Sequence, residues 1–530
     1  MNDTTVPDVT VIVAVYNTMP YLTECLTSLA GQSIGPGRME VVAVDDGSTD
    51  GGGEELDRFA EMYPGVFRVM HQANSGGPAV PSNRALDVAR GRYVFFLGAD
   101  DYLGTEALER MVRAADEYGS DVLLGRTEGV NGRNILQDVY ERTEPDLDLY
   151  ASALPWSLSN TKLFRRSHIE AYGLRFPEDM PVCSDQPFTI EACVRAGRIS
   201  VLADYTYYYA VRRDDDTNLT YSSPPLTRLA AGETIIETTA ALLEPGPKRD
   251  FVLKRHFAWE LAKLLRKTFL DCDQDTRVQL CANVEKLCDR YLTEGIREQL
   301  TARQRLRLAL ACRGAVDELA ETLRVHLDGE HPPLMIDGDT ILCCLPGYGD
   351  ERLAIPDDCY TLTGSLIPHI AATGCEARWQ RRLLALKVRT TLYGSPSALT
   401  VALAHTWRAK RWAGTTRKVA EGPPRPLGPV TARSTHGDLD VLLNVSELVE
   451  RAPLAEAVHP VRLYAEITGN TYEIPLPAPE PGPSALLWHQ GKPYEVSTDA
   501  DDRGHLQIKI APCGLRQVLL WPTRRFGRRP

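Results

Sequence analysis

Runs of apolar, mostly β-branched residues alternate with segments of helical spacing through the first 125 residues. We expect strands at residues 9–15, 40–44, 67–71, 93–97 and 122–125, and helices at residues 21–29, 81–89 and 105–118. This alternation is typical of an α/β domain with a mainly parallel sheet. Such sheets bind ligands at the carboxyl ends of their strands. Two acidic pairs, Asp45-Asp46 and Asp100-Asp101, lie at expected strand ends, which indicates a ligand site at that edge.

The rest of the chain changes character twice. Residues 226–327 have an almost entirely helical pattern, and residues 251–270 have the i, i+3, i+4 apolar spacing of one amphipathic helix. From about residue 331, Pro, Gly and Thr become frequent and short β-like runs recur, which is typical of sandwich-like modules. A Pro- and Gly-rich stretch at 422–429 indicates a boundary between two modules. We therefore expect four parts, at residues 1–225, 226–330, 331–421 and 422–530.

Charge and composition argue against several classes of function. The 530-residue chain has a net charge of −12, so we expect no nucleic acid partner. No apolar run approaches the roughly 20 residues of a membrane span, and the polar N-terminus does not resemble a secretory signal. The twelve cysteines show no CxxC spacing, which favours reduced thiols in a cytoplasmic protein, with contact to the inner face of a membrane left open. A basic cluster at the end is either a solvated tail or a contact for an anionic polymer or membrane; it comprises Arg524, Arg525, Arg528 and Arg529.

The segment 44–50 reads Val-Asp-Asp-Gly-Ser-Thr-Asp, at the end of the second expected strand. Its carboxylates are suitable acceptors for the imide N–H of a uracil ring, but an Asx-type turn with surface acids has the same sequence pattern. The residues alone leave both interpretations open. In the Gly-rich region that follows, Asn74, Asn83 and Arg84 are candidates to reach a ribose or a phosphate.

Asp100 and Asp101 lie at the end of the expected strand 93–97. Adjacent carboxylates repel each other unless a cation is present, and hard divalent cations prefer carboxylate and phosphate oxygens. We therefore expect Mg²⁺ or Mn²⁺ to bind both acids and bridge them to a diphosphate, whose developing charge it would neutralise. The structural alternative is that Asp101 caps the helix expected at 105–118.

Three segments, taken in order, resemble a known family. They read Val-Ile-Val-Ala-Val-Tyr-Asn at 11–17, Asp-Asp-Gly-Ser-Thr-Asp at 45–50, and Phe-Phe-Leu-Gly-Ala-Asp-Asp-Tyr at 95–102. With these spacings, residues 9–215 resemble the family 2 glycosyltransferases, which have the GT-A (Rossmann-like) fold. The resemblance implies that a UDP-linked sugar binds between the first strand end and the acidic motifs. The predicted donor-binding residues are Ala14, Tyr16, Asp45, Asp46, Asn74, Asn83, Arg84, Ala99, Asp100, Arg212 and Arg213.

The catalytic residues follow from the same resemblance. The family's metal-binding Asp-x-Asp element corresponds to residues 98–100, where Gly98 replaces the first acid and Asp100 is expected to touch the cation. The family's catalytic base corresponds to Asp185, and Ser184 precedes it where Glu is more common. Asp185 would take the proton as an acceptor hydroxyl attacks the anomeric carbon, which inverts that centre. It can also cap the helix that follows. The predicted acceptor-binding residues are Arg126, Glu178 and Ser184.

The order of the expected parts resembles that of the wall teichoic acid β-N-acetylglucosaminyltransferases. Those enzymes have a GT-A domain, a helical linker and C-terminal immunoglobulin-like β-sandwich modules that trimerise. The resemblance implies an inverting enzyme that moves N-acetylglucosamine from its UDP donor to a hydroxyl of a cell-wall glycopolymer such as teichoic acid, and that acts as a homotrimer. Capsule, glycolipid, peptide and natural-product acceptors remain alternatives. A catalytically decayed chain that only binds sugar or acts as a scaffold is a further alternative.

Overall fold

The structure is a computed structural model that falls into two compact units, Met1–Leu300 with Ala311–Val316, and Thr301–Leu310 with Asp317–Pro530. It describes residues 6–214, 223–328, 332–337, 340–362, 371–380, 382–394, 400–404, 408–410, 416–418, 430–432, 438–445, 449, 457–467, 470–480, 482–514 and 518–519. The stretch 422–429 and the C-terminal arginines lie outside the described residues. The four predicted parts stay a prediction.

A seven-stranded sheet in the order β3-β2-β1-β4-β8-β6-β9 forms the centre of the first unit. Its strands are β1 (Val9–Val15), β2 (Met39–Asp45), β3 (Phe67–His71), β4 (Tyr93–Phe96), β6 (Val122–Gly125), β8 (Lys162–Arg165) and β9 (Ile199–Leu202). Strand β1 pairs in parallel with β2 and β4, whereas β8 is antiparallel to β4 and β6. Because the chain runs outward from β1 to β3 and returns to β4 on the other side of β1, the strand order reverses between β1 and β4. Ligands bind at such switch points.

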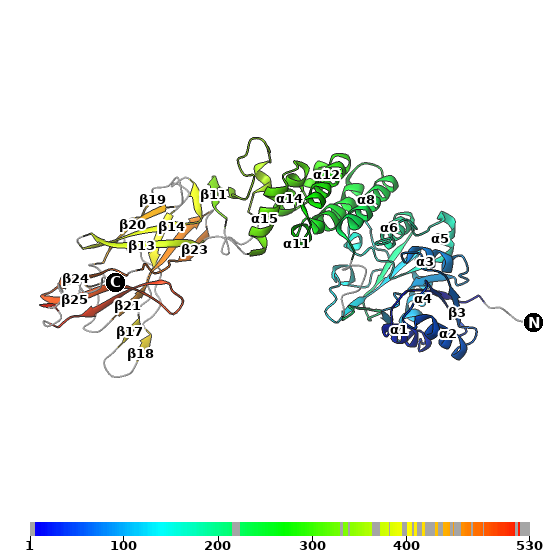
Figure 1. Ribbon diagram of the computed structural model, residues 1–530. Coiled ribbons are helices and arrows are strands. Elements are labelled where there is room, and N and C mark those ends of the chain that lie inside the picture. Colours follow the sequence, from blue (N-terminus) through cyan, green and yellow to red (C-terminus); the bar gives the residue numbers. More distant parts are fainter. Residues whose placement is uncertain are drawn as a thin grey trace, which may run out of the picture. The chain divides into compact units, whose positions relative to one another are not determined.

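Helices cover both faces of this sheet (Figure 1). They are α1 (Tyr21–Ala30), α2 (Gly52–Met62), α3 (Ala79–Leu86), α4 (Ala107–Tyr118), α5 (Arg166–Tyr172) and α6 (Asp185–Arg195). Alternate side chains of β1 point to opposite faces, so Val11 and Val13 join one hydrophobic core and Ile12 joins the other. Burial on both faces explains why the strands are continuously apolar. A small sheet, β5-β10-β7, comprises β5 (Tyr102–Leu103), β7 (Thr127–Val130) and β10 (Tyr208–Val211).

A helical segment completes the first unit. It contains α8 (Pro225–Leu242), α9 (Pro247–Arg255), the π-helix η3 (His256–Leu261), α10 (Ala262–Leu264), α11 (Lys267–Leu270), α12 (Gln274–Tyr291) and α13 (Glu294–Arg297). The prediction of one continuous amphipathic helix at 251–270 was wrong. The π-turn interrupts it, and Leu265 leaves helical geometry at φ −88° and ψ 53°. Neither the π-turn nor the break at Leu265 is visible in the spacing of apolar residues, on which the prediction was based.

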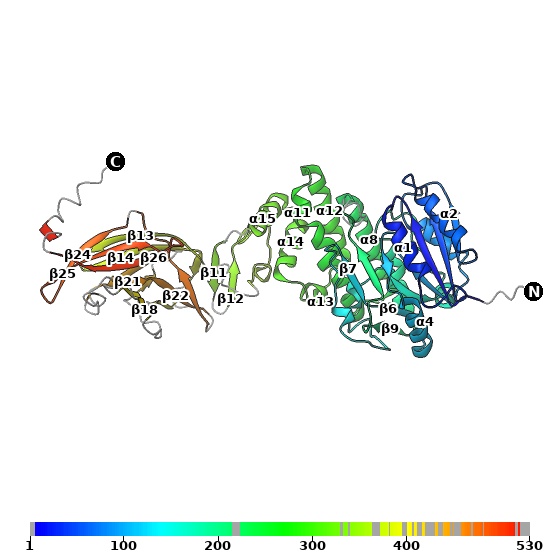
Figure 2. The same ribbon diagram turned by 90° about the horizontal axis from the view of Figure 1, so that it is seen from below.

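The second unit contains most of α14 (Ala302–Cys312), all but the first residue of α15 (Val316–Asp328) and several sheets (Figure 2). The strand orders are β12-β11-β15, β13-β14-β20-β19, β16-β22-β23 and β18-β17-β21-β26-β25-β24. The strands are β11 (Leu334–Asp337), β12 (Thr340–Cys343), β13 (Ala372–Gln380), β14 (Leu383–Thr390), β15 (Leu392–Gly394), β16 (Thr400–Ala404), β17 (Arg408–Lys410), β18 (Thr416–Lys418), β19 (Val430–Ala432), β20 (Asp438–Asn444), β21 (Ala457–Pro460), β22 (Arg462–Ile467), β23 (Asn470–Pro475), β24 (Ser484–His489), β25 (Lys492–Ala500) and β26 (Leu506–Pro512). Alternating burial along β26, at Leu506, Ile508 and Ile510, shows a sheet with one packed face. Among the described residues, no helix is both long and apolar enough to cross a bilayer.

Candidate active site

A cavity of about 680 Å³ opens at the switch point between β1 and β4. Ile12 and Ala14 line it from β1, and Phe96 and Gly98 from the end of β4. Another part of its wall comes from the helical segment, and the residues there are Arg228, Arg255, Trp259, Glu260, Lys263 and Arg266. A volume of this size suits a nucleotide sugar or a similar ligand. The sequence prediction of a site at the strand ends included none of these helical residues.

The acidic turn after β2 is held by hydrogen bonds within the protein. Asp45 Oδ1 accepts from the backbone N–H of Ser48 at 2.9 Å, and Asp45 Oδ2 lies 3.1 Å from His71 Nδ1. Burial raises the pKa of Asp45, but the hydrogen bonds from Ser48 and His71 outweigh it and keep the pKa below its usual value. Asp46 accepts from Gln72 Nε2 at 2.6 Å and from the Ser75 hydroxyl at 2.9 Å. The two carboxylates therefore fix the turn and the segment beside it.

Three predicted donor residues lie in the same region. Asn74 Oδ1 accepts from the N–H of Gly76, and Arg84 Nη1 donates to the carbonyl of His71 at 3.1 Å. Asn83 is buried and bonds to residue 176 through both ends of its amide, and its Nδ2 also donates to Glu178 Oε1 at 3.0 Å. Asn83 thus joins α3 to the segment that leads to Asp185. Tyr16 is exposed at the end of β1.

Asp100 and Asp101 have different surroundings. Asp101 is buried; its Oδ1 accepts from the N–H of Val211 at 2.7 Å, and its Oδ2 accepts from the Tyr208 hydroxyl. Burial and the neighbouring charge of Asp100 raise the pKa of Asp101 to about 7. Asp100 Oδ2 instead accepts from Arg213 Nε at 2.8 Å. The side chain of Asp101 therefore accepts hydrogen bonds from β10, whereas that of Asp100 accepts one from the segment that follows β10.

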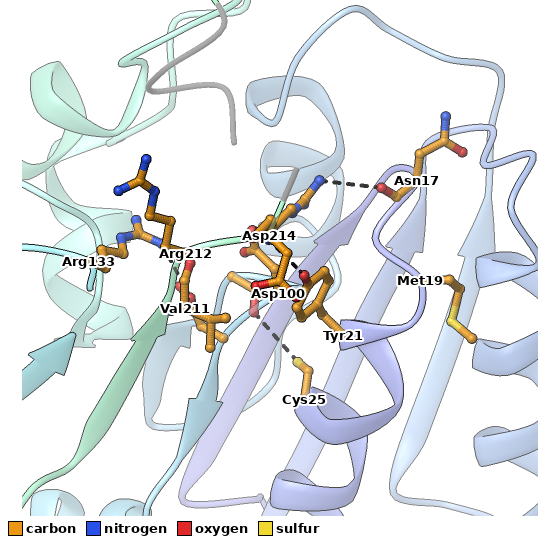
Figure 3. A network of polar contacts seen from close by, with 12 residues as sticks. Asn17, Met19, Tyr21, Cys25, Asp100, Arg133, Val211, Arg212 and Asp214 are labelled. Carbon is orange, nitrogen blue, oxygen red and sulfur yellow. Dashed lines mark hydrogen bonds and ion pairs between the residues drawn. The ribbon is translucent and has the colours of Figure 1, made fainter. Parts of the chain in front are cut away.

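The segment after β10 is attached to α1 as well. The hydroxyl of Tyr21 on α1 accepts from the backbone N–H of Asp214 at 3.1 Å (Figure 3). Arg213 Nη1 lies 3.5 Å from the carbonyl of Asn17. Arg212 is half-buried, and its backbone N–H donates to the carbonyl of Val130. These contacts place Arg213 beside the proposed cation ligand.

Protein ligands for a cation are few at this site. Among the described residues, no group of three or more His, Cys, Asp or Glu side chains could hold a metal ion. Gly98 cannot be replaced by the family's first acid without movement, because a Cβ there would lie 2.7 Å from Asp101 Oδ2. A divalent cation at this place would have Asp100 as its protein ligand, and oxygens of a diphosphate and water would supply the other ligands. This set suits Mg²⁺, which typically binds one or two carboxylates together with substrate phosphates.

Asp185 is the first residue of α6 and lines the cavity with Ser184. Burial raises the pKa of Asp185 to about 6, although the positive charge of Lys162 opposes this effect. Lys162 is fully buried and donates through Nζ to the carbonyls of Ser157 and Ser159. Burial lowers the pKa of Lys162 to about 8. A carboxyl group with a pKa near 6 is suited to accept a proton at neutral pH.

The predicted acceptor residues are not all at the cavity. Ser184 is buried in its wall, Glu178 bonds to Asn83, and Arg126 Nη2 donates to the carbonyl of Tyr140 at 3.1 Å. Neither Glu178 nor Arg126 lines the cavity. Trp156 and Trp259 do line it and form an edge-on pair with ring centroids 6.3 Å apart.

Comparisons with known proteins identify two regions of the chain. The family described as "Glycosyl transferase family 2" matches residues 10–176, and the family described as "Glycosyl transferase TarS linker domain" matches residues 229–323. The poly(ribitol-phosphate) beta-glucosyltransferase of Bacillus spizizenii is 36% identical over 259 residues, which are 48% of this chain and 41% of that protein. The poly(ribitol-phosphate) beta-N-acetylglucosaminyltransferase TarS of Staphylococcus aureus is 38% identical over 260 residues, which are 47% of this chain and 44% of TarS. The matched region thus spans less than half the length of these relatives.

A shorter relative is matched over most of its length. The putative glycosyltransferase EpsH of Bacillus subtilis is 30% identical over 253 residues, which are 46% of this chain and 71% of EpsH. Residues 1–349 of S. aureus TarS, solved with UDP-GlcNAc, align with a TM-score of 0.58 at 29% identity over 67% of this chain and 99% of that structure. The longer TarS structure aligns with a TM-score of 0.58 at 22% identity over 96% of this chain and 86% of that chain. The predicted fold class, a GT-A domain followed by a helical linker and C-terminal β modules, is confirmed, and the chain belongs to the family 2 glycosyltransferases.

Proposed function

We propose that this chain transfers N-acetylglucosamine from UDP-N-acetylglucosamine to a hydroxyl of an anionic polyol-phosphate polymer, with inversion at the anomeric carbon. One observation carries the proposal. A single cavity combines the strand ends at the switch point, the carboxylate of Asp185, and a basic wall of Arg228, Lys263 and Arg266. The relatives named for poly(ribitol-phosphate) make this polymer the first acceptor to test. The predicted homotrimer and cytoplasmic location stay predictions.

Different residues have separate tasks in this proposal. Asp185 accepts the proton of the acceptor hydroxyl while the hydroxyl oxygen attacks the anomeric carbon. The sugar–phosphate bond breaks on the opposite face, and the diphosphate leaves with the bonding electron pair. Arg213, which donates to Asp100, would pair with that diphosphate. Mg²⁺ or Mn²⁺ bound with the donor at Asp100 would supply further neutralisation of its charge.

The basic wall supports an anionic acceptor even though the chain has a net charge of −12. Arg228 lies on α8, Lys263 on α10, and Arg266 just beyond α10. Lys263 Nζ also lies 5.7 Å from the centroid of the Trp259 ring. Cations gathered along one wall attract a polyanion locally whatever the total charge of the chain.

Reversing the charge at Arg228 or Lys263 should raise the KM for polymeric acceptor by about 10-fold or more. The reason is that each variant removes a charge-assisted contact to a phosphate and adds a repulsive carboxylate. Initial rates of UDP release at several acceptor concentrations, for Arg228→Glu and Lys263→Glu, measure the effect. Lys286→Glu on the exposed face of α12 is the matched control. A KM that stays unchanged in both wall variants would show that the acceptor does not bind along this wall.

The rate of transfer should fall as the pH is lowered through about 6, because Asp185 must be ionised to accept a proton and its pKa is raised to about 6. The ionised form predominates above this pH, and the protonated form predominates below it. The measurement is kcat/KM for the acceptor between pH 4.5 and 8, with the donor held at saturation. An acid limb near pH 4, the usual range of an aspartate, would contradict the raised pKa.

A panel of donors and acceptors tests the proposal as a whole. UDP-N-acetylglucosamine and UDP-glucose are each incubated with poly(ribitol phosphate) and poly(glycerol phosphate), and UDP release is measured. UDP-glucose is the second donor because the B. spizizenii relative is named a glucosyltransferase. Acceptor-dependent release from UDP-N-acetylglucosamine supports the proposal, and faster release from UDP-glucose would replace the sugar that it names. No release with either polymer would overturn the proposed acceptor.

A further inference from the structure

The helical segment contacts the start of α6 through a closed network of three side chains. Arg255 Nη1 donates to Gln186 Oε1 at 2.6 Å and pairs with Glu260 Oε1 at 2.7 Å. Gln186 Nε2 donates to the same oxygen of Glu260 at 3.3 Å. Gln186 directly follows Asp185, and all four residues line the cavity. The network therefore joins the helical segment to the first turn of α6.

The π-helix η3 is what brings Arg255 and Glu260 together. In an α-helix, residues five positions apart are rotated by about 140° about the axis, so their side chains diverge. The wider i→i+5 turn of a π-helix places such residues on nearly the same side. Arg255 precedes η3 directly, and Glu260 lies within it. Short π-segments inside α-helices often occur at functional sites.

This arrangement is costly in the folded chain. The side chains of Arg255 and Glu260 are only 7% and 15% exposed, so both charges have lost most of their water. Arg255 Nε is also buried without a hydrogen-bond partner among the described residues. A buried ion pair seldom stabilises a protein more than apolar side chains of the same volume would. A contribution to stability therefore does not explain why the charged residues Arg255 and Glu260 pack against the first turn of α6.

We propose that Arg255 and Glu260 are positioning residues for the catalytic base, which hold the first turn of α6 through Gln186 and set the electric field at Asp185. The helical segment then forms part of the catalytic apparatus as well as a wall of the cavity. This inference rests on the proposed role of Asp185 as the base.

Three charged groups and one thiol lie near Asp185. Lys162 approaches Asp185 from β8 and Arg255 from α9, and both positive charges favour the ionised carboxylate. Glu260 in η3 opposes ionisation of Asp185. The fourth group, the Cys183 thiol, has a pKa raised by burial and by the charge of Asp185, so it stays neutral near neutral pH. Removing the charge of Glu260 should therefore make Asp185 more acidic, and removing that of Arg255 should make it less acidic.

The test is the acid limb of the pH–rate profile in four variants of the full chain. Glu260→Gln should move the limb to lower pH by about 1 unit, and Arg255→Gln should move it to higher pH by a similar amount. Arg255→Lys keeps the charge and should keep the limb near its wild-type position. In the double variant, Arg255→Gln with Glu260→Gln, the acid limb should return toward its wild-type position. The two substitutions shift the pKa of Asp185 in opposite directions, so their effects cancel. The exposed pair of Glu237 and Arg290 provides the control variants Glu237→Gln and Arg290→Gln.

A second readout separates this inference from the proposed function. Carboxyl ¹³C NMR of aspartate-labelled protein, with the Asp185 signal identified by its loss in Asp185→Asn, follows the same ionisation without any acceptor. If the pKa of Asp185 shifts in opposite directions in Glu260→Gln and Arg255→Gln, the inference is supported even if the acceptor proves to be a different one. If the Asp185 titration stays within about 0.3 unit of wild type in both variants, the inference is overturned, even where kcat falls. Melting temperature and UDP affinity are measured alongside to confirm that each variant is folded.

Discussion

Asp185→Asn should lower kcat for sugar transfer by about 10³-fold, because an amide of the same shape cannot accept the proton of the attacking hydroxyl. Asp185 begins α6 and lines the cavity between the strand ends and the basic wall. The substitution keeps the volume of the side chain and removes a buried charge. We therefore expect a folded protein with a melting temperature close to that of the wild type. UDP affinity should change little, since the proposed donor contacts lie at the strand ends.

The matched control is Glu191→Gln on the same helix. Glu191 pairs with Arg195 on the surface, at 2.8 Å, so its neutralisation should leave kcat within about twofold of wild type. Steady-state rates with polymeric acceptor and saturating donor compare the two variants. If Asp185→Asn keeps more than about a tenth of the wild-type rate, the proton is taken elsewhere. Glu260, the other carboxylate in the cavity wall, would then be the next candidate.

The sequence contained enough information to predict the N-terminal fold and the edge of the sheet at which the site lies. Continuous apolar runs identified β1, β2 and β4 because a parallel sheet covered on both faces buries every residue of such strands. The antiparallel strand β8 was not predicted, because two of its four residues, Lys162 and Arg165, are charged and it forms no continuous apolar run. Motif resemblance placed Asp185 and Ser184, both of which line the cavity.

Other features depend on contacts between residues far apart in the sequence. The adjacent acids differ because Tyr208 and Val211, more than 100 positions away, donate hydrogen bonds to Asp101, whereas Arg213 donates to Asp100. The sequence analysis did not predict that the helical segment lines the cavity. Apolar spacing identifies the buried face of a helix, but it does not indicate a π-turn. The only available signal was the group of cations within the amphipathic stretch 251–270. That signal is equally typical of a solvated surface.

Asp100→Asn should weaken UDP binding in the presence of Mn²⁺ by about 100-fold and should have a much smaller effect in EDTA. In the proposed function Asp100 would be the protein ligand of the cation, because Gly98 has no side chain and Asp101 is bonded to β10. A neutral amide oxygen is a poor substitute for a carboxylate toward a hard cation. Calorimetric titration of UDP, first with Mn²⁺ and then with EDTA, measures the dissociation constant of UDP under both conditions.

Asp101→Asn is the informative comparison for this prediction. Asp101 accepts from the N–H of Val211 and the hydroxyl of Tyr208, so its replacement should lower the melting temperature and leave most of the Mn²⁺ dependence intact. The reverse pattern, with Mn²⁺ dependence lost in Asp101→Asn and kept in Asp100→Asn, would assign the cation to the inner carboxylate. Equal UDP affinity of the wild-type chain in Mn²⁺ and in EDTA would show that donor binding needs no cation. Arg213, which already pairs with Asp100, would then be a positive charge available to the diphosphate at this edge of the sheet.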